Sequence, residues 1–345
     1  MIKDKIENIK EFGENHIPIV TFKSLEGIDW LKCGFSTRLG GVSKGCFSSM
    51  NMSFCRGDDA VDVMENIRLF SEAVGFEPQN IVMPHQCHTT NVQIVGKKEC
   101  GRGIHLSLLK NPGNHRSDKQ GTPDNLTQYK DIPGTEEEVD GQITNEKDVV
   151  LYVLGADCVP VFLVDVEKEV VSAVHAGWRG TADNIVQAAI DKMRDNFGSD
   201  TRDIKAVIGP SICQDCYEVS ADVADIFVSK YILNKSLLSN NNSNQPKDQS
   251  EDQPKDQQDV QYPIGSDMSI VRPASGDFDN NPTQKYYLNL WEANRVNLIN
   301  AGIKPENIEV SGICTKCHSD IFYSHRAHGN DRGVNCGYIT IRSKL

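Results

Sequence analysis

The sequence lacks any apolar run of the ~18 residues that a membrane-spanning helix needs, and its apolar stretches, such as 149–154 and 159–164, are short. It also lacks an excess of positive charge. Among 345 residues, 36 Lys and Arg stand against 48 Asp and Glu, for a formal charge of −12. The first absence excludes an integral membrane protein. The second argues against nucleic acid or an anionic membrane as a partner, because both repel such a chain at long range.

A signal for export is missing as well. The first ten residues alternate charged side chains with isolated isoleucines, with no continuous apolar segment and no small-residue cleavage site. Eleven cysteines is an odd number, and a chain of this length can build a packed core without disulfide bonds. We therefore expect a cytoplasmic protein whose cysteines are core residues, metal ligands or nucleophiles.

Two stretches differ in composition from the rest of the chain. Residues 236–262 contain almost no apolar side chains and repeat the string Gln-Pro-Lys-Asp-Gln at positions 245 and 253. Such a segment cannot bury enough surface to offset the entropy of ordering its backbone, so we predict a disordered low-complexity insertion. Residues 101–138 are rich in Lys, Asn, Asp, Gly and Glu. We predict a surface insertion there, within a single domain that occupies residues 1–345.

Between these stretches, strand patterns alternate with helix patterns. Runs of apolar and β-branched residues predict buried strands at 149–154, 160–165, 169–175 and 203–209. Amphipathic spacing and stop signals predict helices at 62–74, 181–197 and 288–301. The short link between the second and third strands is a hairpin and not a crossover. The pattern therefore indicates an α/β fold with mixed β-sheets packed with helices.

That hairpin brings two reactive side chains together. If its turn is centred on Glu167-Lys168, antiparallel pairing places Cys158 opposite the segment that begins at His175, within a residue or two of register. A thiol and an imidazole then meet at the open end of two strands. Glycines follow at positions 177 and 180, where they allow tight turns and close approach of the backbone to a ligand.

A cysteine and a histidine in this arrangement support three interpretations. In the first, Cys158 is a nucleophile activated by His175, with Asp157 as the group that orients the base. In the second, both residues are zinc ligands, which requires a third ligand; the segment 83–92, with two histidines and a cysteine, offers candidates. In the third, Cys158 is an inert core residue and His175 a hydrogen-bonded histidine at a strand end.

Several motifs in the chain resemble the signatures of one family. In chain order they are Phe35-Ser-Thr-Arg38-Leu-Gly-Gly41, Ser49-Met-Asn51, Gln86-Cys-His88, Val139-Asp140-Gly141, Ala156-Asp-Cys158-Val-Pro160, His175-Ala-Gly-Trp-Arg179-Gly180 and Ile208-Gly-Pro-Ser-Ile212. Together they resemble the YfiH family, which was long described as polyphenol oxidase or laccase. The resemblance extends over a core of about 33–341 and lapses in the two insertions.

The family is now described as zinc-dependent purine nucleoside phosphorylases with adenosine deaminase activity. The resemblance therefore implies purine nucleosides and inorganic phosphate as substrates and Zn²⁺ as the cofactor. By their positions in the motifs, the implied metal ligands are His88, Cys158 and His175. His85 and Cys87 fall outside the matching position and are expected to be neighbours only.

Each implied reaction requires particular groups. Deamination needs an activated water at C6 of adenosine and a group that transfers protons, for which Asp157 is the candidate. Phosphorolysis needs a site for an anion that attacks C1′ of the ribose. We expect catalytic roles for Asp157, Arg38 and Asn51, and substrate-binding roles for Arg179, Trp178 and Arg326. Near Arg332 the order of Gly and Arg departs from the family pattern, so no role is assigned to it.

Two further cysteine motifs have the Cys-x-x-Cys spacing, at 213–216 and at 314–317. A four-cysteine zinc site that joins them is an alternative, but roughly 100 residues separate the pairs, far beyond the usual spacing of such sites. The family pattern contains Cys216 and Cys314, whereas Cys317 and His318 are additions of this sequence. We expect neither pair to be catalytic.

Other functions compete with the phosphorylase interpretation. A metal-free Cys158–His175 hydrolase would be abolished by thiol alkylation and not by a zinc chelator. A copper polyphenol oxidase is physically weaker, because multicopper chemistry needs clustered histidine pairs and the chain has nine histidines in all. A non-enzymatic purine-binding module with a structural zinc is the third alternative. We expect a monomer or a small homo-oligomer.

Overall fold

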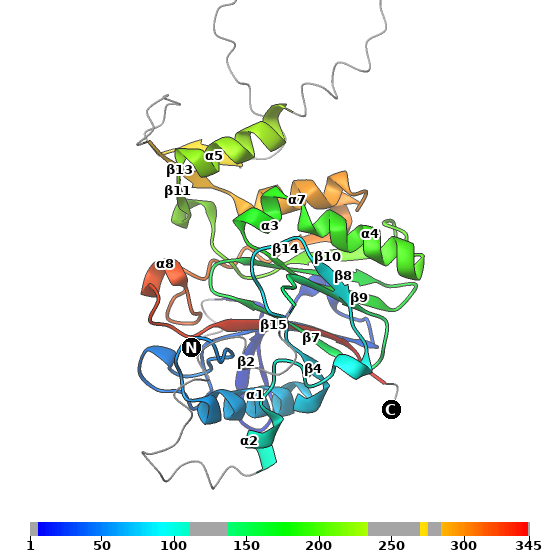
Figure 1. Ribbon diagram of the computed structural model, residues 1–345, viewed down its shortest axis with the longest axis vertical. Helices are drawn as coiled ribbons and strands as arrows, with labels where there is room; N and C mark the ends of the chain where they lie inside the picture. Colours follow the sequence, from blue (N-terminus) through cyan, green and yellow to red (C-terminus); the bar gives the residue numbers. More distant parts are fainter. Residues whose placement is uncertain (1–5, 111–136, 234–269, 275–283, 344–345) are drawn as a thin grey trace, which may run out of the picture.

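Two six-stranded β-sheets lie face to face, and helices cover the outer face of each, so that the molecule has four layers (Figure 1). The computed structural model describes residues 6–110, 137–233, 270–274 and 284–343. The predicted α/β fold with mixed sheets is confirmed. In the described part of the chain, no helix has the length and apolar character to cross a membrane.

The first sheet is antiparallel except at one edge. Across the sheet, its strands are β1 (Ile9–Phe12), β2 (Ile17–Val20), β3 (Leu31–Ser36), β15 (Asn335–Ile341), β7 (Val150–Gly155) and β4 (Ile81–Val82). Only β4 runs parallel to its neighbour. The carboxyl-terminal strand β15 thus lies in the middle of the sheet, where it pairs with β3 and β7.

The second sheet contains the predicted hairpin. Across the sheet, its strands are β14 (Ile308–Val310), β10 (Ile204–Ile208), β8 (Val159–Asp165), β9 (Val170–Ala176), β6 (Gly141–Thr144) and β5 (Val92–Ile94). The pairs β10–β14 and β5–β6 are parallel and the others antiparallel. A third sheet contains β11 (Glu218–Ser220), β13 (Lys285–Leu288) and β12 (Val271–Pro273).

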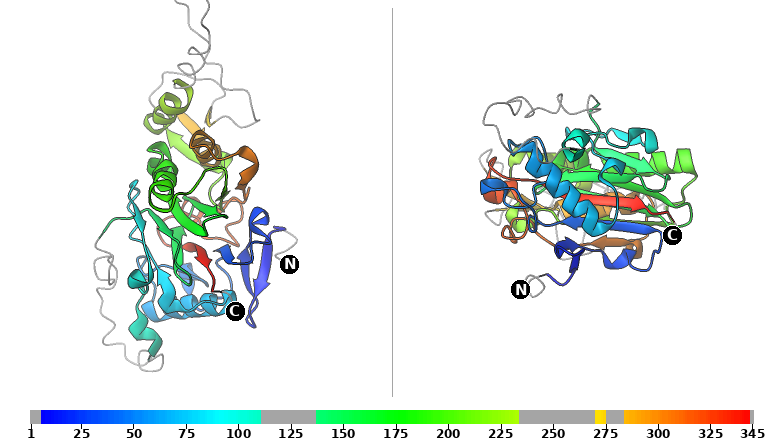
Figure 2. Two further views of the ribbon diagram at one scale, coloured as in Figure 1. Left: turned by 90° about the vertical axis from the view of Figure 1, so that its right-hand side faces the viewer. Right: turned by 90° about the horizontal axis from the view of Figure 1, so that it is seen from below.

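Helices lie on both outer faces. On the first sheet are α1 (Ala60–Val74) and α2 (Leu106–Lys110); on the second are α3 (Trp178–Ala182), α4 (Ile185–Phe197) and α7 (Leu290–Asn300). The remaining helices are α5 (Ala221–Val228), on the third sheet, and α8 (His325–His328). Figure 2 shows the same layers from the side and from below.

Short turns of 3₁₀ helix occupy several of the connections: Lys23–Leu25, Gly45–Phe47, Pro78–Asn80, Lys97–Glu99, Gln214–Cys216 and Pro305–Asn307. A π-helical turn at Ser229–Leu233 follows α5.

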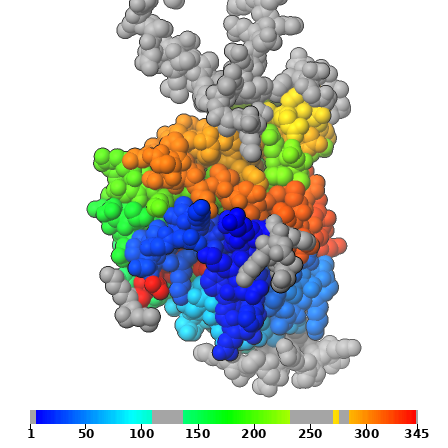
Figure 3. Space-filling view, turned by 180° about the vertical axis from the view of Figure 1, so that it is seen from behind, coloured from blue at the N-terminus to red at the C-terminus, as the bar shows by residue number. Residues whose placement is uncertain are grey.

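On the rear face, the blue N-terminal residues lie beside orange residues near β14 (Figure 3). There the backbone N–H groups of Lys23 and Ser24 donate to the carboxylate of Glu309, at 3.2 and 2.7 Å.

Strand alternation divides the apolar side chains between cores. On β8, Val161 and Leu163 face the helices α3, α4 and α7, whereas Phe162 and Val164 face the other sheet. On β7, alternate residues face the other sheet and α1. Because both faces of these strands are buried, their sequences read as continuous apolar runs and not as an alternating pattern. This explains why the predictions for strands 149–154 and 160–165 are close to the observed bounds.

The hairpin register is confirmed. Asp165 pairs with Val170 and Val159 with Ala176, so the turn is centred between Glu167 and Lys168. The same register places Cys158 opposite Gly177, inside the predicted segment.

The prediction of one helix at 181–197 is wrong. The structure has two helices, α3 and α4, because Asn184 adopts a left-handed conformation (φ 60°) and its side-chain oxygen accepts a hydrogen bond from the N–H of Gln187. Short side chains of Asp and Asn compete with helical hydrogen bonding and favour caps, which explains the break. The predicted stop at Gly198 is confirmed, since this residue ends α4 in the left-handed conformation.

The two predicted insertions fall mostly outside the described residues. The stretch 236–262 lies entirely outside them. Of the stretch 101–138, the structure describes both ends: Ile104 is buried under the first sheet, and Glu138 bridges to His85. These ends are therefore packed against the domain.

Candidate functional site

Most of the motif residues lie at one edge of the second sheet. The strands β9, β10 and β14 end at this edge, and β5, β6 and β8 begin there, as their parallel and antiparallel pairing requires. Loops that leave or enter six strands consequently meet in one place. Sheet edges of this kind are common sites of binding and catalysis, because a rigid scaffold positions the loops.

Cys158 lies where the chain crosses from one sheet to the other. Strand β7 of the first sheet ends at Gly155, and β8 of the second sheet begins at Val159. By the alternation of β8 and β9, Cys158 and His175 fall on the faces that look toward the first sheet. The two side chains therefore meet at the open end of the space between the sheets.

The structure brings together the three residues that were predicted as metal ligands. The ligating atoms of His88, Cys158 and His175 all lie within 4.8 Å of one another. The Cys158 Sγ lies 3.7 Å from the His88 Nε2, and the two imidazole rings are nearly perpendicular, with centroids 4.8 Å apart. The His175 side chain is buried, whereas that of His88 is exposed.

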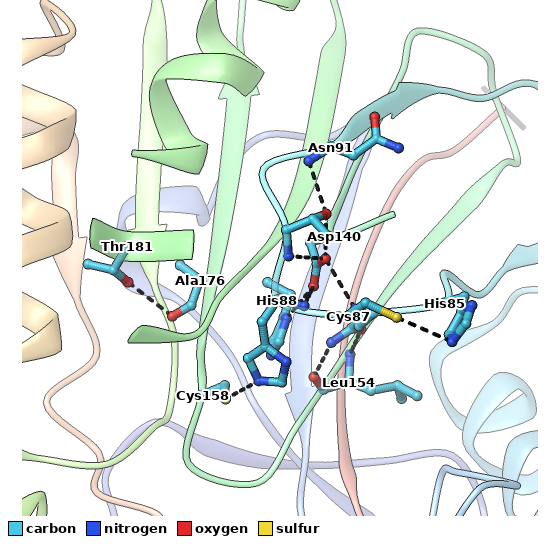
Figure 4. Close-up of polar contacts among 12 residues, drawn as sticks. His85, Cys87, His88, Asn91, Asp140, Leu154, Cys158, Ala176 and Thr181 are labelled. Carbon is cyan, nitrogen blue, oxygen red and sulfur yellow. Dashed lines mark hydrogen bonds and ion pairs between the residues drawn. The ribbon is translucent and has the colours of Figure 1, made fainter. Parts of the chain in front are cut away.

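A single carboxylate, Asp140, positions two of these residues (Figure 4). One of its oxygens lies 2.8 Å from the Nδ1 of His175 and accepts the backbone N–H of His88 at 3.0 Å. The other accepts the N–H groups of Cys87 and Thr89 and the Thr89 hydroxyl, at 2.7 to 3.1 Å. Asp140 thus leaves the Nε2 of His175 free to bind a ligand and sets the shape of the turn that carries His88.

Asp140, Cys158 and His175 shift one another's pKa values. Burial raises the pKa of Asp140, but the hydrogen bond and charge of His175 and the donors of Thr89 outweigh it and lower this pKa to about 2. Burial also raises the pKa of the Cys158 thiol, yet His175 and then His88 lower it to about 6. Burial lowers the pKa of His175, and the Cys158 thiolate and Asp140 together raise it to about 9. These shifts favour the thiolate form of Cys158, which is the form that binds a metal or acts as a nucleophile.

Gly177 is required by the closeness of this packing. A Cβ atom built on Gly177 would lie 2.5 Å from the Cδ2 of His88 and 3.5 Å from the Sγ of Cys158. Its φ of −62° is an ordinary value, so the requirement is one of space and not of backbone conformation. No other residue type fits here without displacing the ring of His88.

The three residues line a pocket of about 720 Å³. Its walls come from the 53–56 loop, the crossover 154–158, α3, the turn before β11, and the segment 325–334. Its lining residues are Ser53, Cys55, Arg56, Gln86, His88, Leu154, Gly155, Ala156, Asp157, Cys158, His175, Trp178, Ile212, Tyr217, Leu290, His325, Arg326, Asn330, Arg332 and Val334. A volume of this size is in the range of small-molecule sites.

Three arginines, Arg56, Arg326 and Arg332, line the pocket and give it a cationic side. Arg332 is buried, with 5% of its surface exposed, and its guanidinium donates to the carbonyl of Gly333. Its Nε has no hydrogen-bond partner within the described chain. Burial, followed by the like charge of Arg56, lowers the pKa of Arg332 to about 10. A buried guanidinium with a free donor beside a second arginine is suited to an anion.

The predicted substrate residues divide into two groups. Trp178 and Arg326 line the pocket, and the Arg326 guanidinium lies over the ring of Tyr217 at 4.8 Å. Arg179 does not line it; this exposed side chain lies over the ring of Trp178, at 4.3 Å. A substrate-binding role for Arg179 stays a prediction.

Arg38 and Asn51, for which catalytic roles are predicted, are also absent from the lining of this pocket. Arg38 donates to the carbonyls of Ser48 and Ser319. Asn51 is fully buried, donates to the carboxylate of Asp58, and accepts the N–H of Val334. Asn51 thereby contacts Val334 of the pocket wall, whereas Arg38 connects loops that are not part of the lining.

Asp157 lines the pocket, but its carboxylate contacts other residues than expected. One oxygen accepts the Thr315 hydroxyl and the other the backbone N–H of Arg326, each at 2.7 Å. The carboxylate that contacts His175 is instead Asp140. Asp157 has a left-handed φ of 94°, in the crossover between the sheets.

Sequence reasoning missed the roles of four residues: Asp140, Arg56, Tyr217 and Arg332. Asp140 and Tyr217 lie in strings that the family resemblance quotes or adjoins, which was the available signal. The motif around Arg332 departs from the family pattern, so the sequence assigns this residue no role. Arg56 has no local signal, because an exposed loop arginine is ordinary in any protein.

The donor set fits a single zinc ion. Two histidine nitrogens and one cysteine sulfur are typical ligands, and in the described chain no fourth His, Cys, Asp or Glu belongs to this group. All three side chains line the pocket, so a metal ion held by them would border it.

Fold and site define an α/β protein with a pocket built around a His₂Cys group. The chain belongs to the YfiH family, whose family model, described as multi-copper polyphenol oxidoreductase laccase, matches residues 32–252 and 256–342. The predicted family resemblance is confirmed.

Curated relatives in this family carry names of purine enzymes. The chain is 30% identical over 312 residues to "Purine nucleoside phosphorylase YlmD" of Bacillus subtilis, covering 90% of this chain and 88% of the relative. It is 29% identical to "Adenosine deaminase RL5" from an unknown prokaryotic organism, covering 90% and 93%. Among solved structures, YlmD from Geobacillus stearothermophilus matches with a TM-score of 0.70 and 28% identity, covering 97% of this chain and 100% of that chain.

Proposed function

We propose that this chain is a zinc-dependent purine nucleoside phosphorylase that also deaminates adenosine. The observation that carries the proposal is a single pocket lined by a His₂Cys group, three arginines and the aromatic rings of Trp178 and Tyr217. The relatives named purine nucleoside phosphorylase and adenosine deaminase support both activities. The pocket volume suits a nucleoside with phosphate.

In this proposal, His88, Cys158 and His175 hold the zinc ion. The bound ion would supply Lewis acidity and lower the pKa of a coordinated water. Asp140 accepts the Nδ1–H of His175, which directs the Nε2 toward the pocket. The same carboxylate holds the 87–89 turn, so that His88 keeps its position beside Cys158.

Arg332 and Arg56 form the phosphate subsite. Arg332 lines the pocket beside Arg56, and an anion bound there would relieve the repulsion between the two guanidinium groups. Arg326 lines the same pocket, and its guanidinium contacts the ring of Tyr217. The purine is expected to lie against the apolar part of the lining, which includes Trp178 and Leu290.

In phosphorolysis, one bond forms at C1′ of the ribose and one bond breaks there. An oxygen of phosphate forms a bond to C1′ of the ribose, and the bond from C1′ to N9 breaks, leaving its electron pair on the purine. The purine takes up a proton, and the products are free base and ribose 1-phosphate. In deamination, the oxygen of water adds at C6 of adenosine and ammonia leaves, which gives inosine.

We assign Asp157 a positioning role. Its two oxygens bind Thr315 and the N–H of Arg326, so it connects the crossover between the sheets to the segment that carries Arg326. The carboxylate therefore holds the pocket wall in place beside Cys158.

The proposal is tested by turnover of adenosine and inosine with and without phosphate. Free base, ribose 1-phosphate and ammonia are measured for the wild type and for the variants Cys158→Ala and Arg332→Gln. We expect both activities to disappear in Cys158→Ala. We expect Arg332→Gln to raise the KM for phosphate by about tenfold or more, equivalent to about 1.4 kcal/mol, with a smaller effect on deamination.

Two variants serve as controls. Cys46→Ala removes an exposed cysteine outside the pocket lining, and Arg202→Gln removes an exposed surface arginine paired with Asp200. Both should keep wild-type kinetics. Absence of base release and of ammonia from zinc-loaded wild-type protein would overturn the proposal.

A second function is favoured by one specific observation. Cys158, His175 and Asp140 form a chain of nucleophile, base and orienting carboxylate, with the thiol pKa lowered to about 6. A metal-free cysteine hydrolase would use such a chain. Iodoacetamide would abolish its activity, whereas a zinc chelator would leave it unchanged; the phosphorylase is expected to lose activity with the chelator.

A further inference from the structure

Four cysteines that are far apart in the sequence meet on the structure. The ligating atoms of Cys213, Cys216, Cys314 and Cys317 all lie within 4.8 Å of one another. Their separation in the chain argued against a joint site, and the structure corrects that argument. Strands β10 and β14 are parallel neighbours, so the loops that follow them leave the same edge of the sheet together.

Each cysteine pair lies on a tight turn. A 3₁₀ turn follows Cys213, and the N–H of Cys216 donates to the carbonyl of Cys213 at 3.2 Å. In the second pair, the N–H of His318 donates to the carbonyl of Cys314 at 3.1 Å. The two turns are connected by a parallel bridge between Ser211 and Cys314. Backbone hydrogen bonds thus hold both pairs together at the ends of two paired strands.

Two of the distances between the sulfurs are close to those of a tetrahedral metal site. With zinc–sulfur bonds of ~2.3 Å, the sulfurs of a tetrahedron lie roughly 3.8 Å apart. The Sγ of Cys317 lies 3.5 Å from that of Cys216 and 4.0 Å from that of Cys213. The buried sulfur of Cys314 accepts the N–H groups of Cys213 and Cys317, at 3.3 and 3.4 Å. Such donors stabilise a thiolate.

We propose that Cys213, Cys216, Cys314 and Cys317 bind one zinc ion as a tetrathiolate site, separate from the His88–Cys158–His175 group. Binding releases the protons of the four thiols to solvent, and four thiolates fill the coordination sphere of the metal. With no open position for water or substrate, the site is structural. Cys317 is exposed, which gives the ion a path of entry.

A disulfide is a poorer explanation of the cluster. It would need only two cysteines, whereas four sulfurs converge here. It would also consume an oxidant, and thiol groups are only weak hydrogen-bond donors to one another. The convergence of all four on one point is what a metal ion requires.

The proposed site borders the wall of the pocket. Ile212 precedes Cys213, Tyr217 follows Cys216, and both line the pocket. Thr315 follows Cys314 and donates its hydroxyl to Asp157. Zinc at the four cysteines would therefore connect the two loops that carry these residues and fix the position of Tyr217.

Metal content tests the proposal without reference to activity. The full-length protein is purified without chelator, and zinc per chain is measured for the wild type and for Cys317→Ser, Cys216→Ser and Cys158→Ala. We expect two zinc ions in the wild type and one in each variant. Cys317→Ser combined with Cys158→Ala should bind none. Cys46→Ser, which alters an exposed cysteine outside both groups, should keep two.

A measurement on the wild type keeps the test valid if a variant fails to fold. Cadmium-113 NMR of the cadmium-loaded chain should show two resonances, one at the shift of a tetrathiolate site and one at that of a mixed nitrogen and sulfur site. A single resonance of the mixed type would overturn the proposal. One zinc per chain that is lost in Cys158→Ala and kept in Cys317→Ser would also overturn it, and would leave the proposed phosphorylase intact. One zinc per chain that is lost in Cys317→Ser and Cys216→Ser but kept in Cys158→Ala would support the tetrathiolate site. It would count against zinc at the His88–Cys158–His175 group.

Discussion

At the residue scale, the site depends on single side chains that each satisfy several neighbours. Asp140 accepts hydrogen bonds from the 87–89 turn and contacts His175, so one carboxylate sets the positions of two residues that are distant in sequence. Gly177 leaves the space that the ring of His88 occupies. Neither residue would bind the metal, yet both decide whether the ligands can meet.

The variant Asp140→Asn tests the first of these roles. An amide offers one acceptor oxygen where the carboxylate uses two, and its NH₂ group would face the N–H donors of the turn. We expect zinc affinity at the His₂Cys site to fall roughly 10- to 100-fold, the usual effect of losing such a partner. Competition with a chromogenic chelator measures it. Asp200→Asn, at an exposed ion pair, is the control, and equal affinities in both variants would contradict the assignment.

The variant Gly177→Ala tests the second role. Its methyl group would force the His88 ring away from Cys158, so we expect a loss of zinc at the His₂Cys site with little change in global stability. Gly180→Ala is the matched control, since a Cβ at Gly180 meets its neighbours at 3.4 Å, an ordinary contact distance. Zinc content and thermal unfolding distinguish the two variants. Full zinc binding by Gly177→Ala would show that His88 is not a ligand.

At the scale of elements, the break between α3 and α4 determines where the helices can lie. The short helix α3 begins at Gly177, directly after β9, and carries Trp178 into the pocket lining. Asn184 then ends it and begins α4, which packs on the second sheet. A single continuous helix could not serve both purposes, because its axis would follow one direction only.

Substitutions at Asn184 measure the strength of this break. Asn184→Ala loses the cap and places a Cβ-bearing residue without a local hydrogen bond in the left-handed region, so we expect a loss of about 2 kcal/mol in unfolding free energy. Asn184→Gly should cost only about a few tenths of a kcal/mol. Urea unfolding of both variants provides the comparison. Equal stability of Ala and Gly would mean that the left-handed conformation is not important here.

At the scale of the whole molecule, both proposed metal sites lie at the same edge of the second sheet. The loops after β9, β10 and β14 and those before β5, β6 and β8 meet there. They lie at one end of the core between the two sheets. The cysteine cluster lies at the β10–β14 side and the His₂Cys group at the β8–β9 side. Stability of the fold and geometry of the pocket are therefore expected to depend on the same loops.

Removal of metal should reveal that dependence. In the Cys158→Ala background, which keeps only the cysteine cluster, we expect a strong chelator to lower the midpoint of thermal unfolding by several degrees, because bound metal stabilises the folded state. In the double variant with Cys317→Ser, the chelator should have no effect. Differential scanning calorimetry measures both. An equal response of the two proteins would show that the cluster contributes no stability.

Local patterns in the sequence determined the elements that form from nearby residues. The hairpin register follows from a short turn between two apolar runs, and the ends of α1 and α4 follow from Asp59, Gly75 and Gly198 as caps. The motif strings also led to His88, Cys158 and His175, which the structure brings together. These features depend on neighbours in the chain or on recognisable strings.

Only the tertiary structure decided which distant residues share a site. Asp140 reaches His175 because β6 pairs with β9, and Arg56 lies near Arg332 because a loop beside α1 meets the segment before β15. The cysteine pairs meet because β10 and β14 are parallel neighbours, a pairing that no local turn specifies. Parallel pairing and the packing of one sheet on another are set by long-range contacts, and local sequence carries no direct signal of them.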